Sequence, residues 1–170
     1  MAIRPIVRYG DPVLAAPAKP VLEFDDALRT LVADMIQTMY AAPGVGLAAT
    51  QIGVPLRLAV IDVSVGEKPG ELMVLVNPEM TSTEGTQEVE EGCLSVPEFV
   101  EVVKRPARAE IRAFDLEGKE YTRQGEGLLA RAFQHELDHL DGRLFLDRLP
   151  SITRSLLVRK VKKRARSEDW

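Results

Sequence analysis

Apolar residues recur at helical spacing in three stretches of the chain. In residues 25–41 they recur every three or four positions, and Pro43-Gly44 ends this stretch. The second stretch covers residues 125–141 and ends at Gly142. The third covers residues 151–166, where one side would be buried through Ile152, Leu156, Leu157 and Val161. The pattern therefore predicts three helices.

Between the first two helices the pattern changes to short apolar runs. Residues 56–63 and 72–77 are predicted to be buried strands, the second ended by Pro78. Three further strands are expected at 100–104, 108–115 and 119–122. This order predicts an α+β fold of mostly antiparallel sheets around the 125–141 helix, with a C-terminal helix. We expect one domain that spans residues 1–170.

The composition narrows the class of protein. Hydrophobic residues make up 45% and charged residues 28% of the chain, which is typical of a globular domain. No apolar run approaches the roughly 20 residues that span a bilayer, and the N-terminus lacks an apolar signal core. Cys93 is the single cysteine, so an intramolecular disulfide is excluded. These features predict a cytoplasmic protein that does not bind membranes.

Charge is distributed unevenly. Residues 151–170 hold seven basic and two acidic residues, a net of +5, within a chain of net charge −4. An acidic body with a basic end favours an anionic partner such as nucleic acid. A solvated helix end explains the same charges without a partner.

The strongest chemical signal lies in the second predicted helix. His135 and His139 are the only histidines, and Glu136 follows the first of them, in the H-E-x-x-H pattern. Residues four apart share one helix face, so both imidazoles can reach one metal ion, and the glutamate can exchange a proton with a metal-bound water. Asp138 and Asp141 are expected on the solvated face of this helix, and Arg105 is expected to be a surface or strand-face charge.

A catalytic metal site needs a third protein ligand. The sole cysteine stands in Glu91-Gly92-Cys93-Leu94-Ser95, and its thiolate could complete a Cys-His-His set. Two plain readings compete with this hypothesis. A free cysteine is often a small buried residue, and H-E-x-x-H also occurs by chance.

Three motifs together resemble the peptide deformylase family. They are, in chain order, Gly44-Val45-Gly46-Leu47-Ala48-Ala49-Thr50-Gln51, Glu91-Gly92-Cys93-Leu94-Ser95 and Gln134-His135-Glu136-Leu137-Asp138-His139. The resemblance covers the whole chain. It implies a metallo-hydrolase that removes the N-formyl group from the formyl-methionine of nascent proteins.

The resemblance also implies roles for individual residues. Cys93, His135 and His139 would hold one divalent metal, with Fe²⁺ the natural ion and Zn²⁺, Ni²⁺ or Co²⁺ as substitutes. Glu136 would be the general base for attack by metal-bound water, and Gln51 and the Leu94 N–H would stabilise the oxyanion. Substrate would contact a further group of residues: Val45, Gly46, Val89, Glu91, Leu128 and Ala132.

Two departures from the family pattern affect the substrate site. Arg131 stands where relatives often carry an aliphatic residue at the pocket mouth, and its charge would either shape side-chain preference or extend to water. Val100 stands where relatives have an arginine at the substrate entrance. The basic helix at residues 151–166 matches, in place and charge, the segment with which relatives dock on the ribosome.

Two alternatives stay open at this point. One is a metallopeptidase of the H-E-x-x-H type, which needs a third His or Glu ligand that residues 140–150 do not supply. The other is a metal-binding or nucleic-acid-binding protein without catalysis, which the basic end supports.

Overall fold

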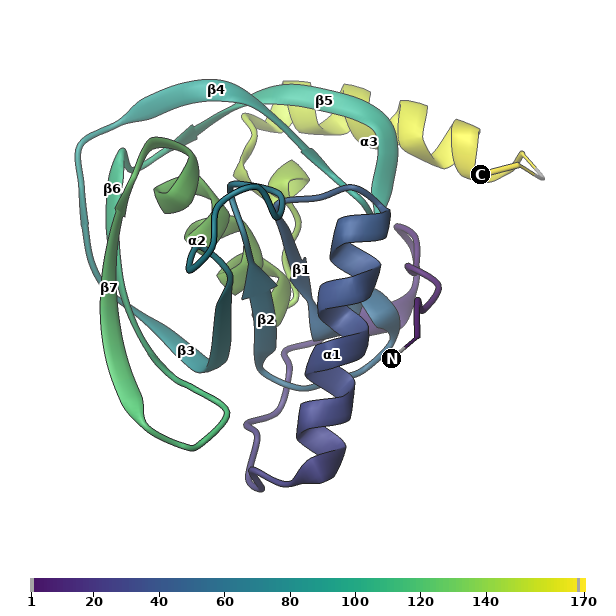
Figure 1. Cartoon of the computed structure of the whole chain (residues 1–170). Coiled ribbons are helices and arrows are strands. Elements are labelled where there is room, and N and C mark those ends of the chain that lie inside the picture. Colours follow the sequence, from purple (N-terminus) through teal and green to yellow (C-terminus); the bar gives the residue numbers. More distant parts are fainter. Residues whose placement is uncertain (1, 168) are drawn as a thin grey trace.

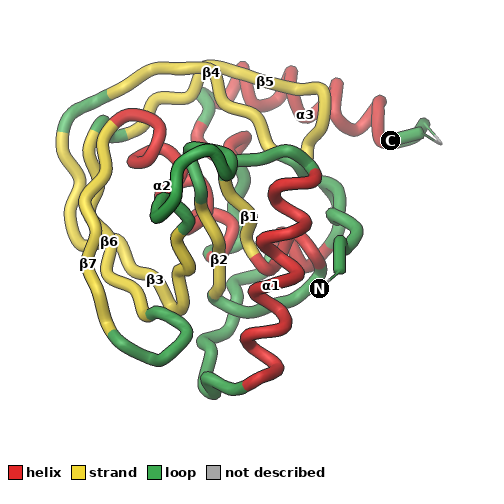
Figure 2. Tube along the Cα trace, viewed as in Figure 1, coloured by secondary structure: helices red, strands yellow, loops and turns green. Residues whose placement is uncertain are grey.

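The computed structural model describes residues 2–167 and 169–170 and places most of the chain in helices and strands (Figures 1 and 2). The elements follow the order η1 (Pro12–Ala15), α1 (Asp26–Ala41), β1 (Gly46–Ala48), η2 (Ala49–Ile52), β2 (Leu58–Ile61), β3 (Met73–Glu84), β4 (Gln87–Cys93), β5 (Val96–Arg105), β6 (Arg108–Phe114), β7 (Glu120–Glu126), α2 (Gly127–Leu140), η3 (Phe145–Arg148) and α3 (Ser151–Ala165).

Two sheets organise the chain. One has five strands in the order β1-β2-β3-β6-β7, and the other consists of β4 and β5. Every ladder between these named strands is antiparallel. The predicted α+β class, with antiparallel sheets and a C-terminal helix, is therefore confirmed.

The expected end of a strand at Pro78 is wrong. Strand β3 continues to Glu84, and its register with β6 shifts between Val76 and Glu79. Asn77 takes a positive φ of 50° at this irregularity. A bulge accommodates a proline because the residue there does not have to donate a ladder hydrogen bond. The polar stretch after Pro78 therefore extends the sheet.

Helix α2 lies against the large sheet and is the element that carries H-E-x-x-H. Its apolar residues Ala130, Ala132, Phe133 and Leu137 pack with buried residues of β2, β3 and β6. Leu140 packs separately on Ala18 and Ala48. Because both apolar contacts fix the same face, the rotation of the helix about its axis is determined, and so is the direction of its histidines.

The N-terminal segment crosses the body close to the first and second motifs. The Val7 N–H donates to the carbonyl of Gln51 at 2.8 Å, and the Tyr9 N–H donates to that of Ser95 at 2.9 Å. Further upstream, Arg4 pairs with Asp34 of α1 at 2.7 Å. The segment therefore links residues 51 and 95, which lie far apart in the sequence.

The β4–β5 pair arches over one end of α2, and α3 projects beside it (Figure 1). Val96 and Val103 of β5 share an apolar cluster with η3 and with Leu157 and Val161 of α3. The expected burial of Ile152 and Leu156 is wrong, because these side chains are 77% and 54% exposed. The buried stripe of α3 is narrow, and both residues lie off it. No helix in the described part of the chain is long and apolar enough to cross a membrane.

Candidate metal centre and active site

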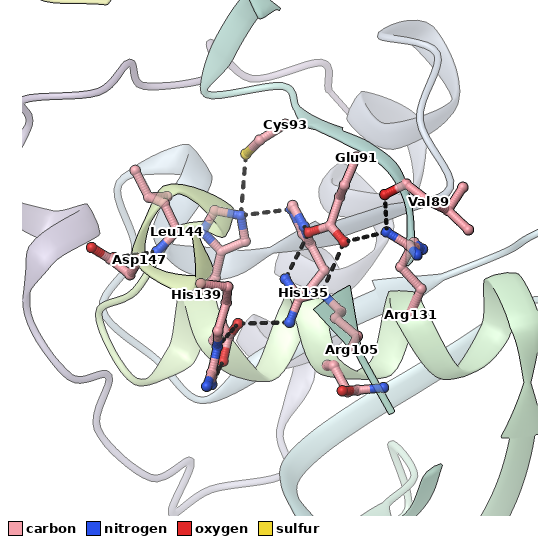
Figure 3. A network of polar contacts seen from close by, with 12 residues as sticks. Val89, Glu91, Cys93, Arg105, Arg131, His135, His139, Leu144 and Asp147 are labelled. Atoms are coloured by element: carbon pink, nitrogen blue, oxygen red, sulfur yellow. Dashed lines mark hydrogen bonds and ion pairs between the residues drawn. The ribbon is translucent and has the colours of Figure 1, made fainter. Parts of the chain in front are cut away.

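Three potential ligand atoms converge at the end of β4. The Cys93 Sγ lies 3.3 Å from His139 Nε2, which lies 3.1 Å from His135 Nε2 (Figure 3). All three atoms lie within 4.8 Å of one another. The helix supplies both imidazoles from one face, and the strand supplies the thiol from across it.

This donor set fits a divalent metal. Bond lengths of about 2.0 Å to nitrogen and about 2.3 Å to sulfur place tetrahedral ligand atoms about 3.3 to 3.5 Å apart, close to the 3.3 Å and 3.1 Å separations at His139 Nε2. Three protein ligands leave one position of a tetrahedral site open, which is the pattern of catalytic sites and not of structural ones. Among the described residues, this is the group of potential ligands that stands close enough to hold an ion.

Glu91 orients one of the two histidines. Its Oε2 lies 2.7 Å from His135 Nδ1, so the opposite ring nitrogen faces the site. Arg105 also donates to both Glu91 oxygens, at 2.8 and 2.6 Å. Burial alone would raise the pKa of Glu91, but the hydrogen bonds from Arg105 and His135 outweigh it and hold the pKa at about 2. The carboxylate therefore stays charged and keeps the imidazole in place.

Two expectations for charged residues are wrong. Arg105 is expected to be a surface or strand-face charge and Asp138 to lie on a solvated helix face, yet they are 3% and 5% exposed and pair at 2.9 Å. Asp138 also accepts from Arg148. Strand alternation offered a signal for Arg105, because Val103, two positions earlier on the same face, is also buried. The helical spacing of Asp138 does not indicate that it is buried. Its partners, Arg105 and Arg148, lie outside the helix, so the pattern within the helix does not reveal them.

Arg131 lines the cavity as a buried residue. It does not extend to water, because only 5% of it is exposed. Its guanidinium donates to Glu91 Oε1 at 2.9 Å and to the carbonyl of Val89 at 3.1 Å (Figure 3). It also donates to the side-chain oxygen of Gln87 at 3.0 Å. It is therefore a buried link between α2 and β4.

Glu136 lies on the cavity side of the metal ligands. It is 3% exposed, and its Oε1 has no hydrogen-bond partner in the described part of the chain. Burial raises the pKa of Glu136 to about 7, although nearby His135 opposes the rise. A cation at the three ligand atoms would lower that pKa. A buried carboxylate oxygen without a partner needs one from the cavity, which suits a group that handles a proton of water or substrate.

Gly46 makes room for the Glu136 carboxylate. A Cβ built on Gly46 lies only 2.5 Å from Glu136 Oε2. The glycine also pairs with Ile61 in the β1–β2 ladder, so the backbone cannot shift away freely. Any side chain at residue 46 must therefore displace the carboxylate.

We expect Gly46→Ala to lower kcat about 10-fold or more, since misplacing a reacting group by about 1 Å can cost roughly 100-fold. Steady-state hydrolysis of a formyl peptide, the substrate that the resemblance implies, measures this loss. The matched control is Gly44→Ala. A Cβ at residue 44 lies 3.0 Å from Leu94 Cδ1, the end of a flexible side chain. Equal kcat values for wild type and Gly46→Ala would contradict the packing argument.

Gln51 is held by both ends of its amide. Its Oε1 accepts from the Ala48 N–H at 3.0 Å, and its Nε2 donates to Ser95 Oγ at 3.2 Å. The same Nε2 lies 3.6 Å from Cys93 Sγ. Gln51 is only 1% exposed, so it is not a surface amide. Its NH₂ group carries a second hydrogen and stands beside the ligand atoms.

A cavity of about 840 Å³ opens beside these groups. Leu94, in the turn after β4, lines it together with the ligands Cys93 and His135. Val100 lines it at the exposed surface. Val89 lies outside the lining and is 51% exposed, and its carbonyl accepts from Arg131. The other residues expected to contact substrate all belong to the lining: Val45, Gly46, Glu91, Leu128 and Ala132.

Comparison with known proteins agrees with this geometry. Residues 3–155 match the family model described as polypeptide deformylase. The chain belongs to this family. It is 52% identical, over the full length of both chains, to the peptide deformylase of Acidobacterium capsulatum. It is also 50% identical over 164 residues to that of Syntrophobacter fumaroxidans, covering 96% of each chain.

Solved structures of peptide deformylases share the fold. A crystal structure from Legionella pneumophila superposes with a TM-score of 0.90 at 50% identity, covering 97% of this chain and 96% of the other. One from Synechococcus elongatus, in complex with actinonin, superposes with a TM-score of 0.84 at 42% identity, covering 88% and 82%. The resemblance seen in three short motifs therefore extends along the chain and through the fold.

Proposed function

We propose that this chain hydrolyses the formyl amide at the N-terminus of formyl-methionyl peptides and releases formate and a free amine. The observation that supports it best is the joint placement of a Cys-His-His ligand set and a buried, unpartnered carboxylate at one end of a cavity. Membership of the deformylase family supplies the reaction. In the proposed unit, residues 1–170 act as a single catalytic domain, since the site draws on segments from 45 to 139.

Cys93, His135 and His139 are the proposed ligands of one divalent metal. When bound, such an ion supplies Lewis-acid chemistry and lowers the pKa of water enough to provide a nucleophile near neutral pH. One thiolate and two imidazoles suit several first-row ions. Fe²⁺ is the proposed natural ion, and Zn²⁺, Ni²⁺ or Co²⁺ could replace it.

The protein's own groups would then move the proton and hold the charge. Glu136 accepts a proton from the attacking water and delivers it to the leaving nitrogen as the C–N bond breaks. The Gln51 NH₂ and the Leu94 N–H donate to the oxygen of the formyl group, which gains charge as the carbon becomes tetrahedral. The lining residues Val45, Leu128 and Ala132, with Glu91 behind them, would enclose the first side chain, with Val89 at the rim. Gly46 would bond the substrate main chain.

Formate release from formyl-Met-Ala-Ser tests the proposal. The enzyme is purified anaerobically, and its metal content is measured in the same sample. Acetyl-Met-Ala-Ser is the matched control substrate, and it should release no acetate at a comparable rate. A metallopeptidase would instead cut internal bonds. Internal fragments without formate would overturn the proposal, and a metal-loaded sample without either product would favour a non-catalytic metal protein.

A second contact is proposed for α3, through electrostatic binding to the ribosome. Arg159, Lys160, Lys162 and Lys163 are exposed, and none forms an ion pair with another described residue. Such a row of free cations suits the phosphates of RNA. Deleting the helix is a poor test, because Leu157 and Val161 belong to the core.

The triple variant Lys160→Gln, Lys162→Gln, Lys163→Gln is therefore expected to weaken ribosome binding without changing formate release from free peptide. The dependence of log K on log salt should become shallower by about 2 to 3. Co-sedimentation across a salt series measures both. The control replaces three exposed lysines elsewhere, Lys68, Lys104 and Lys119, by glutamine. Equal weakening by both triples would indicate a general charge effect and no role for α3.

A cytoplasmic location is part of the proposal. Cys93 must stay a free thiolate to act as a ligand, and a reducing compartment keeps it so.

A further inference from the structure

The two elements that carry the metal ligands are not joined by an apolar interface. Cys93 and the β5 residues Val96 and Val103 pack with η3 and α3. The apolar residues of α2 pack with the large sheet or with Ala18 and Ala48. Within the described residues, no apolar cluster contains both β4 and α2. Their separation must therefore be set by other contacts.

Buried polar contacts supply that link, and Arg131 supplies most of the ones that reach along β4. Its guanidinium bonds Gln87, Val89 and Glu91, which are alternate positions of the strand. Glu91 in turn binds His135 Nδ1. One side chain of α2 thus contacts three alternate residues of β4 and holds this part of the strand at a fixed distance from the helix.

The distance between β4 and α2 also sets the width of the cavity. Helix α2 contributes Leu128, Arg131 and Ala132 to one wall, and β4 contributes Glu90, Glu91 and Gly92 to the wall facing it. The Arg131 guanidinium connects the two walls. If its hydrogen bonds to β4 were lengthened or lost, the walls could move apart. A wider cavity admits bulkier side chains.

We propose that Arg131 is a positioning residue that fixes β4 to α2, and thereby sets both the size of the first-side-chain pocket and the placement of His135. The inference rests on the proposed deformylase function for its substrate readout. Its metal readout is independent of that function.

The test compares Arg131→Leu with wild type in two measurements. The first is the ratio of kcat/KM for formyl-Met-Ala-Ser to that for formyl-Phe-Ala-Ser, which should fall at least about 5-fold as the pocket loosens. The second is metal affinity by chelator competition, which should fall about 10-fold, as for other residues that support a metal ligand. Glu91 keeps Arg105 and His135 as partners in this variant, so the fold should persist.

Two further variants decide the outcome. Arg148→Leu removes another cation next to the site, a partly exposed one that bonds buried Asp138 and not β4. It should lower the Tm but leave the substrate ratio and metal affinity unchanged. Arg131→Lys keeps the charge but can reach fewer acceptors, so it should give intermediate values, and it decides the question if Arg131→Leu does not fold.

The inference is overturned if Arg131→Leu and Arg131→Lys keep both quantities within about 2-fold of wild type, or if Arg148→Leu changes them equally. A wild type that releases no formate would instead sink the proposed function, and the chelator measurement would still decide the role of Arg131.

Discussion

Glu136→Gln should lower kcat by about 100- to 10,000-fold, the usual contribution of a positioned general acid or base. Glutamine keeps the volume of the side chain and its place against Gly46, but it cannot accept a proton from water. KM should change little, because the carboxylate lies at the reacting end of the cavity and adds little to ground-state binding. Stopped-time formate release with excess peptide measures the loss.

Metal retention separates this result from a damaged site. Cys93, His135 and His139 are unchanged in the variant, so its metal content should match that of wild type. A substitution in the same helix turn, Leu137→Met, conserves volume and serves as the control for packing. Full activity of Glu136→Gln with bound metal would remove Glu136 from the mechanism.

Gln51→Leu is expected to lower kcat about 100- to 1,000-fold, which is the usual effect of removing one oxyanion donor from an enzyme. Leucine approximates the volume of the buried amide but has no N–H. The Gln51 amide stabilises a negative charge that exists only in the transition state. Its loss should therefore lower kcat/KM by the same factor as kcat. Steady-state kinetics on formyl-Met-Ala-Ser gives both constants.

Ser95→Ala is the companion variant for Gln51. It removes the Oγ that accepts from Gln51 Nε2 but leaves the donor itself in place. We expect a smaller loss, about 10-fold, because the amide becomes less well oriented. If Gln51→Leu raises KM and leaves kcat unchanged, the amide binds substrate and does not stabilise the transition state.

The helices and the shared helix face of the two histidines could be predicted because each depends on local spacing. His135 and His139 lie four apart, and the helical repeat alone puts them on one face. Cys93 was the one remaining thiol, so the choice of third ligand needed little structural knowledge. The apolar stripe of residues 28–39 likewise defined α1, which the Asp25 side chain caps through the Leu28 N–H.

The charged cluster behind the site could not be predicted in the same way. Arg105 and Asp138 are individually typical surface residues, and their burial depends on partners 33 positions apart in the sequence. The contacts of Arg131 with β4 depend equally on tertiary packing. The course of β3 past Pro78 was missed because a bulge, which sequence pattern does not show, accepts the proline.

The presence of one cysteine, placed among the ligands, gives the chain a built-in reporter. A thiol reagent that reaches half-buried Cys93 has no other thiol to label. Metal protects a thiolate that it binds, so the labelled fraction measures the fraction of empty sites. Oxidation has a related consequence, because each molecule oxidised at this sulfur loses one metal ligand. No second cysteine in the chain can then reduce the oxidised sulfur by forming a disulfide with it.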